Sequence, residues 1–193
     1  MNTKGYHIIL GSGSPRRKEL LGELGFEFEV DTRNTFEEVY SEDTPQESIP
    51  EVLSEGKSLG FHRGLSDKEI LITSDTLVLC EGRVMGKPRD REDAADMLKA
   101  LSGKSHKVIT AVTIRNSERM KTVSDTSLVH FKDLTDSEID YYIDNYRPFD
   151  KAGAYGIQEW IGYIGIDRIE GSYFTIMGLP VHRVYELLLE FIG

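Results

Sequence analysis

Residues 6–24, YHIILGSGSPRRKELLGEL, are the stretch of sequence that decides the fold. The apolar run at 6–10 has the length of a buried strand, and the Gly-Ser-Gly at 11–13 ends it in a polar loop. Ser14 suits a helix N-cap and Pro15 suits the first helical position. The stretch therefore predicts a strand, a loop and a helix, with a buried stripe at Leu20, Leu21 and Leu24 and an end at Gly25.

The junction of this loop with the helix has the features of an anion-binding site. Free backbone N–H groups and the positive end of the helix dipole point outward there. Arg16 and Arg17 are each disfavoured in a first helical turn by about 0.3 to 1 kcal/mol, so their presence indicates an anion between them. A solvated pair of arginines is the alternative.

Two familiar phosphate-binding motifs are excluded. Gly11 and Gly13 begin like the dinucleotide fingerprint, but Arg16 stands where its third glycine is required. The tripeptide at 103–105 (GKS) resembles the end of a P-loop, but Leu98 stands at the position of its first glycine. The missing P-loop disfavours a metabolite kinase.

Length and composition predict one domain over residues 1–193, or two lobes around one cleft. The chain has 193 residues, of which 39% are hydrophobic and 29% charged, as in soluble globular proteins. A net charge of −10 argues against nucleic-acid polymers as partners, although a few cations in one cleft can attract a small anion.

No apolar run approaches the length of a membrane span and no signal pattern begins the chain, so we expect a cytoplasmic protein. The single cysteine, Cys80, excludes an internal disulfide.

Three further stretches contain candidate site residues. Asp75 lies between two apolar strand-like runs, where a carboxylate needs a cation, a metal or backbone N–H donors at a bulge. Glu37 and Glu38 lie in the long irregular segment 31–47, and such segments are usually functional or mobile, although solvated acids are common in loops. Lys57 falls on the inward side of a weak helix interrupted by glycines, where a snorkelling lysine is the alternative.

The rest of the chain mixes strand and helix patterns. Helices are predicted at 91–101, capped by Asp90, after the capping box of Thr135 and Glu138, and at the C-terminus. Strands are predicted at 106–114 and 120–131, and a second hairpin at 164–169 with 173–177. These connections predict an α/β fold with a mixed sheet.

A glycine-rich run precedes Gln158. Small residues let the chain pass close to another surface or a ligand, and the side chain of Gln158 offers both a donor and an acceptor. The segment therefore either brings Gln158 to a base edge or contains its glycines only because they form a packed turn.

These stretches resemble the Maf family of nucleotide pyrophosphatases, motif by motif and in the same order. The first family motif is ASxSPRRxELL, and residues 11–21 depart from it only at Gly11. The later motifs are Asp75-Thr76, Lys87-Pro88, SGxxHxVxT at 102–110, KAGAYGIQ at 151–158, GSY at 171–173 and GLP at 178–180. The chain departs from the family at Glu159, usually glycine, and at Arg147-Pro148, usually Glu-Pro, and the loop around Glu38 aligns loosely.

The resemblance implies an enzyme that hydrolyses nucleoside triphosphates to the monophosphate and pyrophosphate. It also implies a mixed, strongly twisted sheet with flanking helices and two lobes around a cleft, similar to inosine triphosphate pyrophosphatases. Arg16, Thr76 and Gln158 resemble the branch that cleaves dTTP and UTP, with modified pyrimidine nucleotides as further candidates, rather than the branch that cleaves 7-methyl-GTP. The alternative is a nucleotide-sensing regulator of septum formation that does not catalyse.

The residue roles implied by the resemblance fall into three groups. Asp75 is the expected catalytic carboxylate, and with Glu38 it would hold a divalent cation, Mg²⁺ or Mn²⁺. The expected phosphate-binding residues are Ser12, Arg17, Lys57 and Lys87, and those expected to read the pyrimidine are Arg16, Thr76 and Gln158. The expected partners are the nucleotide and a second copy in a homodimer, with no membrane.

Overall fold

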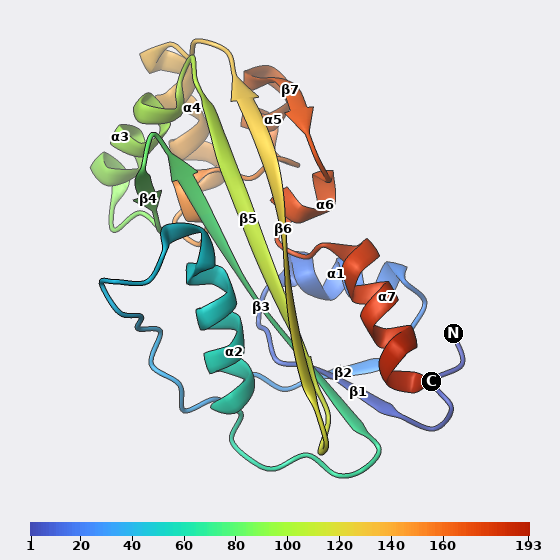
Figure 1. The fold of residues 1–193 in the computed structure, drawn as a ribbon. Helices are drawn as coiled ribbons and strands as arrows, with labels where there is room; N and C mark the ends of the chain where they lie inside the picture. Colours follow the sequence, from blue (N-terminus) through green and yellow to red (C-terminus); the bar gives the residue numbers. More distant parts are fainter. The chain divides into compact units, whose positions relative to one another are not determined.

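The computed structural model describes all residues from Met1 to Gly193. Its elements, shown in Figure 1, are β1 (His7–Leu10), α1 (Pro15–Glu23), β2 (Phe28–Val30), η1 (Gln46–Ser48), α2 (Ile49–Leu59), β3 (Glu69–Cys80), β4 (Arg83–Met85), α3 (Arg91–Leu101), β5 (Ser105–Arg115), β6 (Met120–Phe131), α4 (Asp136–Tyr146), η2 (Ala152–Ala154), α5 (Trp160–Gly165), β7 (Ile166–Glu170), α6 (Tyr173–Met177) and α7 (Val181–Ile192).

The strands form one mixed sheet, which confirms the predicted fold class. Seven strands follow the order β2-β1-β3-β5-β6-β7, with β4 paired to β3. β1 is parallel to both neighbours, with Ile8 opposite Phe28 and Ile70, whereas the β3–β4 and β6–β7 pairs are antiparallel. Parallel pairs need long crossovers and antiparallel pairs can be joined by tight turns, which explains why the sequence mixes both kinds of connection.

The chain divides into two compact units. The first unit comprises residues 1–75, 110–125 and 178–193, and the second comprises 76–109 and 126–177. Strands β3, β5 and β6 each contribute residues to both units. None of the helices has the length and apolar character needed to span a membrane.

The first unit is built on β1 and the beginning of β3. Residues 8–10 and 70–72 are fully buried, as expected for strands that are covered on both faces of a parallel sheet. The C-terminal helix α7 contributes the buried residues Val184, Leu187, Leu188 and Phe191, whose spacing places them on one helical face. The predicted strand, loop and helix at 6–24 are present, with Ser14 as N-cap.

The second unit has its core between the ends of the long strands and helices α3 and α4. Ala94, Leu98 and Leu101 of α3 pack in one cluster with Ile139 and Tyr142 of α4. Both predicted N-caps are confirmed, because the N-cap of α3 accepts a hydrogen bond from the third helical amide and the capping box at the start of α4 is complete.

The predicted second hairpin is only partly correct, because its first strand is present from residue 166 as β7 but its second strand is wrong. Residues 173–177 form helix α6 and not the second strand of a hairpin, and residues 164–165 end helix α5. The short strand β7 pairs with β6 instead, with Ile169 opposite Val129. A short apolar run is compatible with either a helix or a strand, so the presence of a neighbouring strand to pair with decides which of the two forms. Residues 28–30 form only the short strand β2, where Val30 remains 42% exposed.

Candidate active site

The loop before α1 lies close against β3. A Cβ atom at Gly11 would lie 2.9 Å from Cγ2 of buried Thr73, so glycine is the residue that fits here. Ser12 is buried, and its hydroxyl oxygen accepts hydrogen bonds from the Ser14 amide and from Nη1 of Arg17, both at 3.3 Å. The predicted loop therefore also holds the side chain of Arg17.

Arg17 is fixed by the C-terminal part of the chain. Its Nε donates to the carbonyl oxygen of Gly178 at 2.8 Å, and the same oxygen accepts from the hydroxyl of buried Ser74 at 3.2 Å. Burial lowers the pKa of Arg17, the charges of Asp75 and Glu38 raise it, and neighbouring positive charge lowers it. An arginine side chain does not deprotonate in proteins, so this guanidinium is a permanent cation near Asp75.

Lys57 joins the two predicted carboxylates. Its Nζ lies 2.5 Å from Oδ1 of Asp75 and 3.0 Å from Oε1 of Glu38. The Lys57 and Asp75 side chains are 18% and 13% exposed, whereas Glu38 is 56% exposed. A buried carboxylate needs a partner of opposite charge, and Lys57 supplies it to Asp75. The prediction that Lys57 faces inward is confirmed.

The packing of Phe36 brings the loop that contains Glu38 onto α2. A Cβ atom at Gly56 would lie within 2.7 Å of three atoms of the Phe36 ring, and one at Gly60 would lie 2.6 Å from Phe36 Cβ. The side chain of Asn34 donates to the Lys57 carbonyl at 2.6 Å and accepts from the Phe36 amide at 2.8 Å. The glycines that weaken this helix in the sequence therefore make room for the loop.

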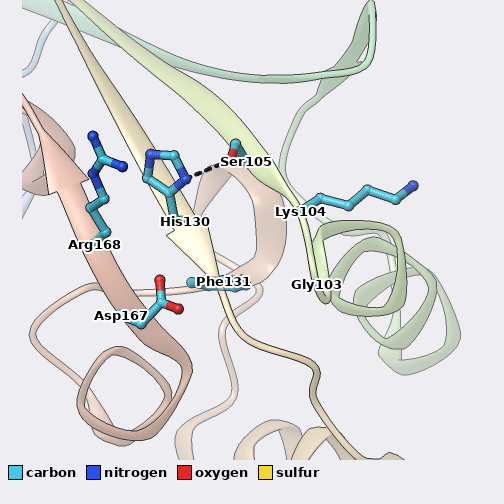
Figure 2. Close-up of a pocket in the computed structure, with 7 residues that line it drawn as sticks. All are labelled: Gly103, Lys104, Ser105, His130, Phe131, Asp167 and Arg168. Atoms are coloured by element: carbon cyan, nitrogen blue, oxygen red, sulfur yellow. Dashed lines mark hydrogen bonds between the residues drawn. The ribbon is translucent and has the colours of Figure 1, made fainter.

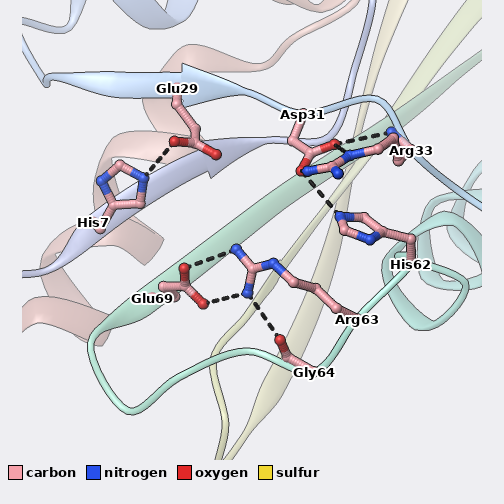
Figure 3. A network of polar contacts seen from close by, with 8 residues as sticks. All are labelled: His7, Glu29, Asp31, Arg33, His62, Arg63, Gly64 and Glu69. Atoms are coloured by element: carbon pink, nitrogen blue, oxygen red, sulfur yellow. Dashed lines mark hydrogen bonds and ion pairs between the residues drawn. The ribbon is translucent and has the colours of Figure 1, made fainter.

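A second polar network, drawn in Figure 3, holds the base of the same loop. The Asp31 carboxylate accepts two hydrogen bonds from the Arg33 guanidinium, at 3.0 and 2.6 Å, and lies 3.1 Å from Nε2 of His62. The hydrogen bond from Arg33 is the main reason that the pKa of Asp31 is well below its usual range. Arg63 and Glu69 form a separate bidentate pair that lowers the Glu69 pKa to about 2.

The two carboxylates on Lys57 have the right chemistry for a hard divalent cation. Mg²⁺ and Mn²⁺ prefer oxygen ligands, and Mg²⁺ usually binds through one or two carboxylates together with waters and substrate phosphates. Asp75 and Glu38 would be those carboxylates, since one ammonium reaches both. No group of three or more His, Cys, Asp or Glu side chains is placed to hold a metal by itself.

The other predicted site residues belong to the second unit. Thr76 is the first residue of that unit on β3 and is half-buried. Lys87 follows β4 and is exposed. Gln158 is half-buried and lies in the turn in which the Glu159 amide donates to the Gly156 carbonyl at 3.0 Å. The predicted residues that the structure brings together in the first unit are Ser12, Arg17, Glu38, Lys57 and Asp75, and Arg16 belongs to the same unit beside Arg17.

The second unit also contains an open pocket of about 440 Å³, drawn in Figure 2, that none of the predicted site residues lines. His130 stands in it, with Nδ1 2.6 Å from the Ser105 hydroxyl and Nε2 3.1 Å from the Glu170 carboxylate. These contacts link the neighbouring strands β5, β6 and β7. Lys104 points away and pairs with Glu81.

Ser74 and Gly178 contribute to the position of Arg17, although neither is among the residues expected at the site. Ser74 directly precedes the Asp75-Thr76 motif, and Gly178 begins the GLP motif, so both positions lie in or next to motifs that the sequence shows. Nothing local in the sequence indicates that a carbonyl 161 residues away accepts from Arg17.

Known proteins match almost the whole chain. A family model described as Maf-like protein matches residues 7–191. A dTTP/UTP pyrophosphatase of Porphyromonas gingivalis is 49% identical over 192 residues, covering 98% of this chain and 96% of that protein. A protein of the same name from Bacteroides thetaiotaomicron is 48% identical over 184 residues, covering 95% of each chain. Another from Christiangramia forsetii is 47% identical over 190 residues, covering 98% of this chain and 96% of that protein. The chain therefore belongs to the Maf family.

Proposed function

We propose that this protein hydrolyses nucleoside triphosphates, dTTP and UTP in particular, to the monophosphate and pyrophosphate. Family membership and the names of the similar proteins support this reaction. The observation that carries the proposal is the arrangement around Asp75, where one carboxylate has both an ammonium and a fixed guanidinium nearby. A protein that merely senses nucleotides has no need of a carboxylate among phosphate-binding cations.

The reaction adds water to the α-phosphorus and breaks its bond to the bridging oxygen, which leaves with pyrophosphate. Charge accumulates on that oxygen, so catalysis depends on positioning and charge stabilisation. In our proposal Arg17, Lys57, the Ser12 hydroxyl and the amides at the start of α1 hold phosphate oxygens. Asp75 accepts a proton from the attacking water or, with Glu38, would hold Mg²⁺ or Mn²⁺, which would supply further charge stabilisation.

The remaining residues have proposed roles in phosphate binding and selectivity. Lys87 is a further phosphate-binding cation, and Arg16, Thr76 and Gln158 read the pyrimidine. An amide such as that of Gln158 offers both a donor and an acceptor, so a base without the matching groups leaves them unpaired. We also propose that the protein forms a homodimer, as the family resemblance implies.

The proposal is tested by incubating the purified protein with a panel of normal and modified nucleoside triphosphates and either Mg²⁺ or Mn²⁺. We expect pyrophosphate release from dTTP and UTP well above that from purine triphosphates, and no release when a chelator is present. Nucleotide binding without pyrophosphate release would support the regulator instead. Release of orthophosphate as the first product would show that a different bond is broken.

A further inference from the structure

The second unit contains a largely buried ion pair that joins the two ends of residues 151–159. Nζ of Lys151 lies 3.1 Å from Oε1 of Glu159 and 2.7 Å from Oδ1 of Asp150. The side chains of Lys151 and Glu159 are only 9% and 21% exposed, whereas Asp150 is 58% exposed. Glu159 is therefore the partner that holds Lys151 inside the unit.

Tyr142 of α4 connects the middle of this segment to its end. Its hydroxyl accepts a hydrogen bond from the Gly156 amide at 3.0 Å and donates one to Oε2 of Glu159. Burial and the hydrogen bond to Glu159 both raise the pKa of Tyr142, so the phenol keeps the proton that it donates. The Glu159 carboxylate thus forms an ion pair with an ammonium and accepts a hydrogen bond from a phenol.

The chain between these ends is packed too closely to shift freely. A Cβ atom at Gly156 would lie 2.8 Å from Cδ of Glu159 and 3.1 Å from Cε of Lys151, so the backbone lies directly on the ion pair. The Gly153 amide donates to the Gly86 carbonyl at 3.1 Å, and a Cβ atom at Gly153 would lie 3.1 Å from Val78. The segment is therefore held at several points along its length.

We propose that Glu159, together with Lys151 and Tyr142, is a positioning residue for base selection by Gln158. Gln158 is bonded covalently to Glu159 and lies inside the turn that the Glu159 amide closes on Gly156. A side-chain amide discriminates between bases only if its donor and acceptor are held in one orientation. The inference rests on the proposed function, because it assumes that Gln158 contacts the base.

The test compares kcat/KM for dTTP and dATP in the wild type and in E159A, E159Q, Y142F and Q158A. We expect E159A to lower the dTTP-to-dATP ratio by at least about tenfold, since a displacement near 1 Å can cost about a hundredfold. E159Q keeps an acceptor for Tyr142 but loses the charge that Lys151 needs, so a smaller fall is expected. Hydrogen exchange at residues 152–158 should become faster in E159A and Y142F.

A matched control is available in the same unit. D136N removes the partner of Lys99 in an ion pair whose side chains are 53% and 80% exposed, and it should leave the ratio unchanged. An equal loss of kcat/KM for both nucleotides in E159A and E159Q would overturn the inference, because a merely structural role predicts that result. If E159A does not fold, E159Q and Y142F decide by the same ratio.

The Q158A variant separates the inference from the function on which it rests. A lower ratio in Q158A with an unchanged ratio in folded E159A and E159Q would refute the role of Glu159 and leave the proposed function intact. An unchanged ratio in Q158A would refute base reading by Gln158, and the inference would fall with it. Absence of pyrophosphate release from every nucleotide in the wild type would instead refute the proposed function.

Discussion

The carboxylate of Asp75 lies close to the cationic side chains of Lys57 and Arg17 in the first unit. It lies in β3 after the buried residues 70–74, where an ionised group without a partner would be strongly disfavoured. Lys57 of α2 supplies this partner, and Arg17 is close enough for the charge of Asp75 to raise the pKa of the arginine. The structure thus provides a cation, which is one of the partners that the sequence left open.

We expect Asp75→Asn to lower turnover at least about a hundredfold while the fold is kept, because the loss of one preorganised group in an active site typically has that effect. The substitution keeps the size of the side chain but removes its charge and its basicity. Pyrophosphate release under saturating dTTP measures the effect, and thermal unfolding checks the fold. A folded variant with near wild-type turnover would remove Asp75 from the mechanism.

His106 is a buried residue of the second unit whose role is packing. Its Nε2 lies 2.7 Å from the Tyr155 hydroxyl, its ring packs edge-on against Phe131, and Nδ1 has no hydrogen-bond partner. Burial lowers the pKa of His106 to about 4, with a smaller contribution from His130. The unfolded chain therefore binds a proton near pH 6.5 that the folded protein does not accept until about pH 4.

This difference predicts a pH-dependent stability term. Because the folded pKa is the lower one, His106 contributes stability above about pH 6.5, and that contribution is lost as the pH falls toward 4, by up to about 1.4 kcal/mol per pH unit. His106→Asn should therefore destabilise the protein less at about pH 5 than at about pH 7.5. Urea unfolding of both proteins across this range measures the difference, and a constant difference would contradict the assignment.

At the scale of elements, helix α2 shows how glycines can serve packing between a helix and a loop. Gly56 and Gly60 lower the helix propensity of the sequence, yet Phe36 occupies the space where their side chains would be. This contact holds the loop next to Lys57, the residue that Glu38 pairs with. The weak helix pattern therefore reflects the docking of the loop.

Gly56→Ala should destabilise the protein and weaken catalysis, although alanine favours helix formation. The added Cβ would lie within 2.7 Å of several Phe36 ring atoms, and overpacking typically costs about 1 to 3 kcal/mol. The matched control is Gly22→Ala in α1, where nothing lies within 4 Å and a gain of up to about 1 kcal/mol is expected. Denaturant unfolding and pyrophosphate release measure both variants. Equal effects of the two substitutions would show that Phe36 yields without cost.

At the scale of the whole molecule, net charge and local charge have opposite signs. The chain carries a net charge of −10, yet Arg17 and Lys57 both lie near Asp75 in the first unit, with Arg16 beside Arg17. Local cations can dominate the field that a small anion meets, because distant exposed charges are screened beyond a Debye length of about 10 Å at 0.1 M salt.

We therefore expect kcat/KM for dTTP to fall by about threefold or more as the salt concentration rises from about 0.05 to 0.3 M, since salt screens the attraction to local cations. Steady-state kinetics at constant metal concentration measures it. Lys132→Gln, which removes a surface pair with Glu138, should leave the salt dependence unchanged. A rise of kcat/KM with salt would mean that the net negative charge governs substrate approach.

The sequence alone determined the features that depend on neighbours along the chain. The strand, loop and capped helix at 6–24, the N-caps at Asp90 and Thr135 and the apolar face of α7 all follow from local patterns. Most of the candidate site residues could also be identified from the sequence, because they lie in motifs that resemble those of the family. Local hydrogen bonds and side-chain periodicity require no knowledge of the tertiary fold.

Only the tertiary structure decided which distant groups meet. In the tertiary structure, Arg17 donates a hydrogen bond to the Gly178 carbonyl. Lys57 lies between the carboxylates of Asp75 and Glu38. Residues 173–177 are helical, although their pattern also suited a strand. The physical reason is that a short apolar run or a lone charge gains most of its free energy from contacts far away in sequence. Those contacts exist only once the sheet order and the packing of the helices have brought the partners together.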